Sequence, residues 1–419
     1  MDRQGVLARR IQRRVAATAP ADAGGSRTRS RVSASRGDVA QLRIKGEETG
    51  MKGIYLTVLV VALGVLGGLG YSIYPVVMGG FDENQSFEQL VEQGKTLKKS
   101  PQWRGIIFGP EGQQSPEDFI ADFEKLVDGT LAPIGVNLVI FDMHWNNFHF
   151  TTVPGLEKVS RAPRFDFTRE HAKRMADICH RNGVKVGVGI NFLTHQNYGQ
   201  LLKAFPDYQW PGKENLWDPL NPKVNPVAFK MADELIDAFS ADVIHLGMDE
   251  AWGFDLKNHP DNPGLSNAEL LAREIKQYHQ HFVEEKGKEM ILWSDTLEGR
   301  YSDAPVGDVL DRIPKDIILA HWEYGRKMRY PWPQKLIDKG FRVLVCPWKD
   351  PVAGQKLAMA GLATRDPKML GILYTTWSPS VATKLAGALR GEITETPKDA
   401  IVGVAHTIKR TIGMFGSAD

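Results

Sequence analysis

Two adjacent carboxylates, Asp249 and Glu250, follow the apolar run 243–247 after one further residue, Met248. Unpaired charges are costly to bury inside a protein, so the pair is expected to leave its strand at an exposed rim. There the negative neighbour and apolar walls raise one pKa, which gives one neutral acid beside one anion. Cleavage of a glycosidic bond uses that combination. The structural alternative is a helix amino terminus, where acids meet the positive end of the helix dipole, and spacing alone leaves both open.

Other polar and aromatic side chains stand where predicted strands end. In a barrel of parallel strands, all the carboxyl ends meet at one rim. The residues at these ends are Asp142, His144, His195, Trp293, Asp295, Trp322, Trp348, Asp350 and Trp377. Sugar rings stack on indoles and sugar hydroxyls bond to carboxylates, so the combination indicates a sugar pocket. One tryptophan at a strand end is usually packing, but four successive predicted strands end in or beside one.

Two histidine patterns have simpler interpretations. His245 lies within an apolar run and is interpreted as a core histidine. Asp142, His144 and His195 carry atoms that bind metals, but nothing in their spacing fixes a ligand geometry. We therefore expect neither a metal nor a cofactor.

Eight short apolar runs alternate with amphipathic stretches from about residue 103 to residue 379. Most runs are continuous in Val, Ile and Leu, which is typical of parallel strands buried on both faces. The predicted strands are Arg104–Phe108, Val136–Asp142, Val184–Asn191, Val243–Met248, Met290–Trp293, Ile317–Trp322, Val343–Cys346 and Gly371–Trp377. The clearest helical stretches are Ser115–Val127, Thr168–Arg181, Pro226–Phe239 and Asn267–Lys286.

This alternation predicts an α/β fold, a (β/α)₈ TIM barrel over residues 103–379, followed by closing helices in 380–419. An open doubly wound sheet is the rival, but no G-x-G-x-x-G sequence follows the first predicted strand. The barrel is therefore favoured.

The amino-terminal region differs from the rest. Residues 1–50 are rich in Arg and Ser and lack apolar periodicity, so we expect a disordered leader, or a mis-assigned extension before a true start at Met51. Residues 53–78 contain no charge and are predicted to be a transmembrane or signal-anchor segment. A cleaved signal is the alternative, although no A-x-A-like site follows. Positive charge lies on the amino-terminal flank, so the body, joined through a tether at 79–102, is expected outside the cytoplasm.

Composition excludes several classes of protein. The chain has 419 residues, 42% of them hydrophobic and 24% charged, as in ordinary globular proteins. A formal net charge of +2 argues against a dedicated nucleic-acid binder. The two cysteines, Cys179 and Cys346, form no C-x-x-C pair, so a zinc knuckle or thioredoxin-like site is excluded. Both are interpreted as buried small hydrophobic residues.

The run His245-Leu246-Gly247-Met248-Asp249-Glu250 resembles the H-x-G-x-D-E signature of glycoside hydrolase family 20, the β-N-acetylhexosaminidases. Further resemblances span nearly the whole predicted barrel. They are Arg104-Gly105, Gly135-Val136-Asn137, Trp293-Ser294-Asp295, Trp348-Lys349-Asp350 and Trp377. Thr194-His195-Gln196 and Asp218-Pro219-Leu220-Asn221-Pro222 look closest to a divergent bacterial branch of that family.

The resemblance implies a retaining mechanism in which the substrate assists its own hydrolysis. Glu250 would protonate the glycosidic oxygen and then activate water, while the substrate's acetamido oxygen attacks the anomeric carbon. Asp249 would orient the acetamido group and stabilise its developing positive charge. The implied pocket walls are Trp293, Trp322 and Trp377, and the implied partners of the sugar hydroxyls are Arg104 and Asp350.

The chain also departs from the family pattern. Asp142 and Trp145 occupy the places of a usual His-x-x-Asp pair, Trp348 replaces a tyrosine, and Pro379 replaces an acid. These changes affect substrate recognition more than the acid pair, so the sugar could differ from a terminal N-acetylglucosamine. The leading expectation is a membrane-tethered hexosaminidase acting on an N-acetylhexosamine-containing glycan. The alternatives are a non-catalytic glycan-binding module, a glycosidase with another sugar specificity, and an endo-acting hydrolase.

Overall fold

The structure is a computed structural model that describes residues 85–109, 114–143, 147–156, 166–197, 201–300, 305–378, 381–394 and 400–416. The predicted leader, the predicted membrane segment at 53–78 and the candidate site residue His144 lie outside these ranges. Across the ranges that are described, no helix combines the length and the apolar character needed to cross a membrane.

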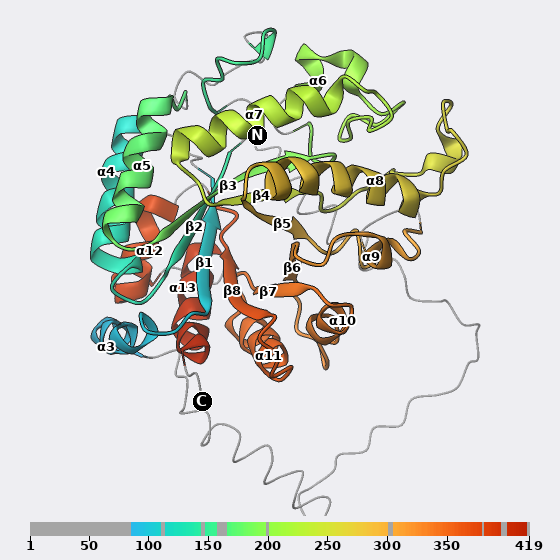
Figure 1. Ribbon diagram of the computed structural model, residues 1–419. Coiled ribbons are helices and arrows are strands. Elements are labelled where there is room, and N and C mark those ends of the chain that lie inside the picture. The colour runs from blue at the N-terminus through green and yellow to red at the C-terminus, as the bar shows by residue number, and fades with distance from the viewer. Residues whose placement is uncertain are drawn as a thin grey trace, which may run out of the picture. The chain divides into compact units, whose positions relative to one another are not determined.

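Eight parallel strands form a closed barrel in which each strand pairs with the next and β1 pairs with β8 (Figure 1). The strands are β1 (Trp103–Phe108), β2 (Leu138–Asp142), β3 (Lys185–Phe192), β4 (Val243–Gly247), β5 (Glu289–Trp293), β6 (Ile318–Trp322), β7 (Arg342–Cys346) and β8 (Met369–Thr375). The predicted (β/α)₈ barrel is confirmed, and every predicted strand overlaps an observed one.

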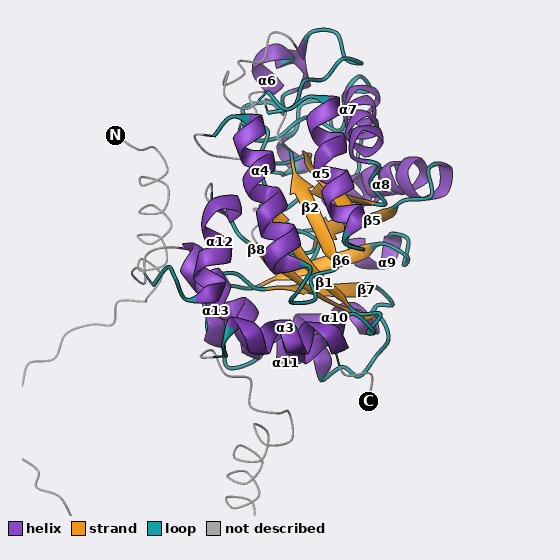
Figure 2. Cartoon of the chain, turned by 90° about the vertical axis from the view of Figure 1, so that its left-hand side faces the viewer, coloured by secondary structure: helices purple, strands orange, loops and turns teal. Residues whose placement is uncertain are grey.

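Helices surround the strands (Figure 2). The α-helices are α3 (Phe87–Leu97), α4 (Pro116–Leu126), α5 (Arg169–Arg181), α6 (Leu201–Ala204), α7 (Val224–Phe239), α8 (Asn267–His279), α9 (Val309–Arg312), α10 (Trp332–Asp338), α11 (Pro351–Leu362), α12 (Val381–Arg390) and α13 (Ala400–Thr411). Short π- or 3₁₀-helical turns are η1 (Val127–Leu131), η3 (Pro206–Tyr208), η4 (Leu256–Asn258), η5 (Gln280–Glu285) and η6 (Ile412–Phe415). Ser86, Ser115, Thr168 and Ser266 cap the amino termini of α3, α4, α5 and α8 by accepting backbone N–H groups.

The buried side chains form two clusters. The barrel interior is filled by branched residues such as Ile140, Val243 and Ile318, and it ends in Trp293 and Trp322 near the carboxyl rim. A larger cluster lies between the strands and the helices. Each fully buried aliphatic or aromatic side chain stabilises the fold by about 1.5–3 kcal/mol relative to exposure. Packing therefore fixes the strand ends that carry the site.

Arg104 closes the amino-terminal end of the barrel. Its side chain is 1% exposed and donates hydrogen bonds to the carbonyl oxygens of Leu97, Gln102, Gly135 and Phe415 at 2.7–2.9 Å. These carbonyls belong to segments at the start of β1, before β2 and in the last turn of the chain. The prediction that Arg104 binds sugar hydroxyls is wrong, because its guanidinium group is buried at the end of the barrel opposite the carboxyl rim and four of its five N–H donors are used by carbonyl oxygens.

Candidate active site

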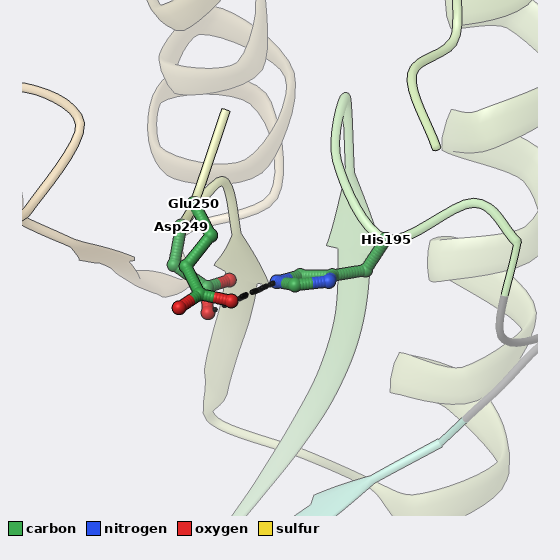
Figure 3. A group of neighbouring side chains, drawn as sticks. All are labelled: His195, Asp249 and Glu250. Atoms are coloured by element: carbon green, nitrogen blue, oxygen red, sulfur yellow. Dashed lines mark ion pairs between the residues drawn. The ribbon is translucent and has the colours of Figure 1, made fainter. Parts of the chain in front are cut away.

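The acid pair and a histidine meet at the carboxyl ends of β3 and β4 (Figure 3). Asp249 and Glu250 follow β4, and His195 lies in the turn after β3. The His195 Nε2 atom lies 3.2 Å from Asp249 Oδ2 and 3.9 Å from Glu250 Oε2. One imidazole therefore contacts both carboxylates, and residues distant in sequence form one site.

The charges of these three groups depend on one another. Burial opposes a charge on His195, but the contact with Asp249 and the nearby Glu250 raise the imidazole pKa to about 9. Burial also opposes ionisation of Asp249, yet the His195 cation lowers the pKa of this carboxyl. For Glu250, burial and the Asp249 charge both raise the pKa. The site therefore pairs an imidazolium and an anionic Asp249 with a Glu250 whose pKa is raised, which is the direction that acid catalysis requires.

The same three residues form a group that could reach a common cation, because their ligand atoms lie within 4.8 Å of one another. This set differs from the one considered in the sequence, where His195 was grouped with Asp142 and His144. A histidine ligand must first lose its proton, and the raised pKa of His195 opposes that loss. The arrangement fits acid–base chemistry directly, and a metal-free site stays a prediction.

A third acid, Asp295, is hydrogen-bonded to the backbone of the acid pair. It is fully buried, its Oδ2 accepts the Glu250 backbone N–H at 2.9 Å, and its Oδ1 accepts the Trp322 indole N–H at 3.1 Å. Burial, followed by the Asp249 charge, raises the pKa of Asp295 well above its usual range. Asp295 therefore accepts hydrogen bonds that hold both the acid's backbone and the pocket wall.

The backbone is strained where the site residues emerge. Leu193, His195, Met248, Glu250 and Trp377 have φ angles between 28° and 71°. Residues other than glycine rarely adopt such φ angles. Each instance costs about 1–3 kcal/mol, which the surrounding packing must offset. Strained residues cluster at active sites. All five lie at or after the ends of β3, β4 and β8, where the candidate site residues leave the barrel.

The glycine of the signature has a steric cause. Gly247 has a φ of +67°, and a Cβ at this position would lie 2.1 Å from Asn191 Oδ1 on β3. The chain around Asn191 is itself fixed, because Gln196 Nε2 donates to the carbonyl oxygens of Asn191 and Thr194, both at 2.8 Å. The close approach of β3 and β4 therefore requires glycine and sets the spacing between His195 and the acid pair.

Aromatic rings line the rim beside the acids. Trp293 lies 6.1 Å from Trp377 between ring centroids, and Tyr324 lies 5.0 Å from Trp322 and 5.4 Å from Trp348. The Tyr324 hydroxyl accepts the Trp377 indole N–H at 2.9 Å. The structure thus brings four predicted tryptophans into one wall, and Tyr324 joins them. Sequence reasoning missed Tyr324, although its place two residues after the end of β6 was a signal.

His245 lies inside the barrel beneath this wall. Its side chain is 2% exposed, its ring lies 4.2 Å from Trp293, and its Nδ1 accepts the Gly247 backbone N–H at 3.0 Å. Burial lowers the His245 pKa to about 3, so the ring is neutral. This environment agrees with the interpretation of His245 as a core histidine that supports the signature loop.

Two other predicted site residues have defined surroundings. Asp142 ends β2, and its Oδ1 packs against Gly189, where an added Cβ would come within 3.0 Å. Asp350 caps α11, since its Oδ1 accepts the backbone N–H groups of Val352 and Ala353 at 3.0 Å each, and its Oδ2 accepts from Arg326. These bonds lower the Asp350 pKa against the opposing effect of burial. Contacts of both acids with a sugar stay predictions.

Comparisons with known proteins agree with this geometry. Residues 166–352 match the family model for the glycosyl hydrolase family 20 catalytic domain. No curated protein sequence matches the chain. Among solved structures, the chain is similar to a chitobiase of Flavobacterium johnsoniae, with a TM-score of 0.56, 16% identity, and coverage of 74% of this chain and 48% of that one.

Two further structures show the same fold. The exo-β-N-acetylglucosaminidase of Vibrio harveyi has a TM-score of 0.51, 12% identity, and coverage of 74% of this chain and 54% of that one. A β-N-acetylhexosaminidase has a TM-score of 0.51, 18% identity, and coverage of 74% and 72%. The chain thus spans about half the length of the first two proteins. The family match covers β3 to β7 with the acid pair, so this part of the barrel is similar to the glycosyl hydrolase family 20 catalytic domain.

Proposed function

We propose that the protein is a glycoside hydrolase that removes β-linked N-acetylhexosamine with retention of configuration, assisted by the substrate's acetamido group. One observation carries this proposal. Asp249 Oδ1 is buried at the site and has no hydrogen-bond partner among the described residues, whereas Oδ2 contacts the His195 cation. A buried carboxylate oxygen without a donor is costly, and the amide N–H of an acetamido group would supply that donor.

The proposed reaction uses the two acids differently. Glu250 donates its proton to the glycosidic oxygen as the bond to the anomeric carbon breaks, and the acetamido oxygen attacks that carbon. Asp249 accepts the amide N–H and stabilises the positive charge of the cyclic intermediate. Glu250, now an anion, then takes a proton from the water that opens the intermediate. The raised pKa of Glu250 and the lowered pKa of Asp249 support this division of roles.

The surroundings of the acids suit a sugar. Trp293 and Trp322 are almost completely buried, while Trp377 and Trp252 are 40% and 44% exposed. Trp252 stands two residues after Glu250 in the sequence. Buried rings can enclose the acetamido end, and exposed rings can stack on sugar faces at the rim.

Hydrolysis of matched substrates tests the proposal. The full-length protein should cleave aryl β-N-acetylglucosaminide or β-N-acetylgalactosaminide and leave their non-acetylated counterparts intact. Glu250→Gln should lower turnover by orders of magnitude in a folded protein. Asp249→Asn should reduce hydrolysis of the acetylated substrates. Cleavage of the non-acetylated sugars by the wild type, with an equal loss in Asp249→Asn, would contradict assistance by the substrate. A folded protein that hydrolyses none of these substrates but binds glycans would instead indicate a glycan-binding module.

We also propose that residues 53–78 tether the protein to a membrane, with the barrel outside the cytoplasm. The proposal is supported by the uncharged sequence of this segment and the arginines before it. Fractionation of cells expressing the full-length chain tests it. Recovery with membranes after a high-salt wash is expected, and recovery of a shortened protein in the medium would indicate cleavage instead.

A further inference from the structure

A buried ion pair between Glu298 and Arg300 lies in the segment that follows β5. The Glu298 side chain is fully buried, and Arg300 Nε donates to its Oε2 at 2.5 Å. Its Oε1 accepts from Ser294 Oγ at 2.5 Å and contacts His321 Nδ1 at 2.7 Å. Burial opposes the charge, but His321, Arg300 and Ser294 together lower the Glu298 pKa. Glu298 is therefore a fixed anion with both oxygens occupied.

This pair connects to the reacting groups through Trp322. Arg300 donates from a terminal guanidinium nitrogen to the Trp322 carbonyl oxygen at 3.1 Å, and its guanidinium carbon lies 5.4 Å from the centre of the Trp322 ring. The Trp322 indole N–H donates to Asp295, which accepts the backbone N–H of Glu250. A continuous series of contacts therefore runs from Glu298 to the backbone of the proposed acid.

The arrangement suits positioning better than bulk stabilisation. Removing two charges from water offsets most of their attraction, so a buried ion pair contributes little net stability compared with apolar packing. A guanidinium group, however, presents donors in a fixed planar fork and stacks on aromatic rings. In this segment Arg300 uses both properties on one side chain, Trp322, which forms part of the pocket wall.

We propose that Glu298 and Arg300 are positioning residues of the active site, which hold Trp322 and, through Asp295, the strained backbone of Glu250. Glu298 fixes the guanidinium group, and Arg300 fixes the indole. Neither side chain is among the groups that the proposed reaction uses. The kinetic part of this inference rests on the proposed function, whereas its spectroscopic part does not.

The kinetic experiment compares Glu298→Gln, Arg300→Ala and Arg300→Lys in the full-length protein. A misplacement of about 1 Å can lower a rate by roughly 10²-fold, so the first two variants should lose kcat on that order, with a smaller change in KM. Arg300→Lys should recover part of the loss, because it keeps the charge beside Glu298. The matched control is Glu289→Gln, which breaks a partly exposed ion pair with Arg342 at the amino-terminal end of the barrel. The control should retain kcat.

The spectroscopic experiment follows the indole N–H signals of the ten tryptophans after ¹⁵N-tryptophan labelling. Trp322→Phe assigns the Trp322 signal. Glu298→Gln and Arg300→Lys should shift that signal, and Glu289→Gln should leave it unchanged. If Glu298→Gln does not fold, the milder Arg300→Lys still decides the result.

The outcomes separate this inference from the proposed function. Loss of kcat together with a shifted Trp322 signal supports positioning. A folded variant with wild-type kcat, or with lost kcat and an unshifted Trp322 signal, would overturn it. If the wild-type protein hydrolyses no acetylated substrate, the proposed function fails. In that case the Trp322 signal alone tests the inference. An unshifted signal in the variants would still refute the connection from Glu298 and Arg300 to Trp322.

Discussion

The Arg104→Lys variant distinguishes a structural role of Arg104 at the amino-terminal end of the barrel from a role in binding sugar. The guanidinium group donates to four carbonyl oxygens at the closed end of the barrel. A lysine keeps the charge, but its donors radiate from one atom and cannot reach carbonyls spread around a planar fork. Loss of two charge-assisted bonds at about 1.5–3 kcal/mol each lowers the free energy of unfolding by about 3–6 kcal/mol. That change corresponds to a Tm lower by roughly 10 °C.

The assay measures thermal unfolding and steady-state hydrolysis of Arg104→Lys below its Tm. We expect reduced stability with an unchanged KM, because the side chain lies at the end of the barrel away from the acids. An increase in KM at wild-type stability would refute this reasoning and restore the sugar-binding role expected from the sequence. Arg342→Lys is a suitable control, since it weakens a partly exposed ion pair at the same end of the barrel.

Four further predictions concern pH, stability and binding. Because hydrolysis needs the protonated form of Glu250, kcat/KM should fall as pH rises through the raised pKa of this acid, which a pH–rate profile checks. His195 has a folded-state pKa of about 9, above its ordinary 6.5, so the stability it contributes is complete below pH 6.5 and is lost as pH rises through about 9. Chemical denaturation of His195→Gln and wild type across this range should show a difference that shrinks at high pH. Glu234 accepts four hydrogen bonds from the backbone and side chains of Thr151 and Thr152. Glu234→Gln should therefore lower the free energy of unfolding by about 2–4 kcal/mol in urea. An unchanged urea midpoint would show that these four bonds do not stabilise the fold. Trp252→Ala should raise KM about 2- to 10-fold for a disaccharide and less for an aryl glycoside, whereas equal effects would argue against stacking at the rim.

The barrel could be predicted because buried parallel strands leave a strong pattern. The predicted strand Val243–Met248 agrees with the observed β4, Val243–Gly247, to within one residue. β8 was less clear, since the prediction extended to Trp377 whereas the strand ends at Thr375. The φ of +28° at Trp377 shows that the chain has already left the sheet there, which apolar character alone does not reveal.

The site could be predicted where polar or aromatic residues come directly after the carboxyl end of a predicted strand. Asp249, Glu250 and His195 meet as expected because all follow carboxyl ends of neighbouring strands. Arg104 was misplaced because its sugar-binding role came from the family resemblance, whereas the predicted strand Arg104–Phe108 already put it at the start of β1, away from the carboxyl rim. Arg300 escaped notice because it lies seven residues beyond β5, and its role depends on a tertiary contact with Trp322.

The central claim is that the substrate's acetamido oxygen is the nucleophile, and a series of fluorinated substrates tests it directly. Replacing the hydrogens of the acetyl methyl group with fluorine, one at a time, weakens that oxygen as a nucleophile and leaves the glycosidic bond unchanged. Using aryl glycosides of this series, we predict that kcat/KM falls steeply with each added fluorine. A value that stays level across the series would contradict the mechanism and would require a nucleophile from the protein or from water.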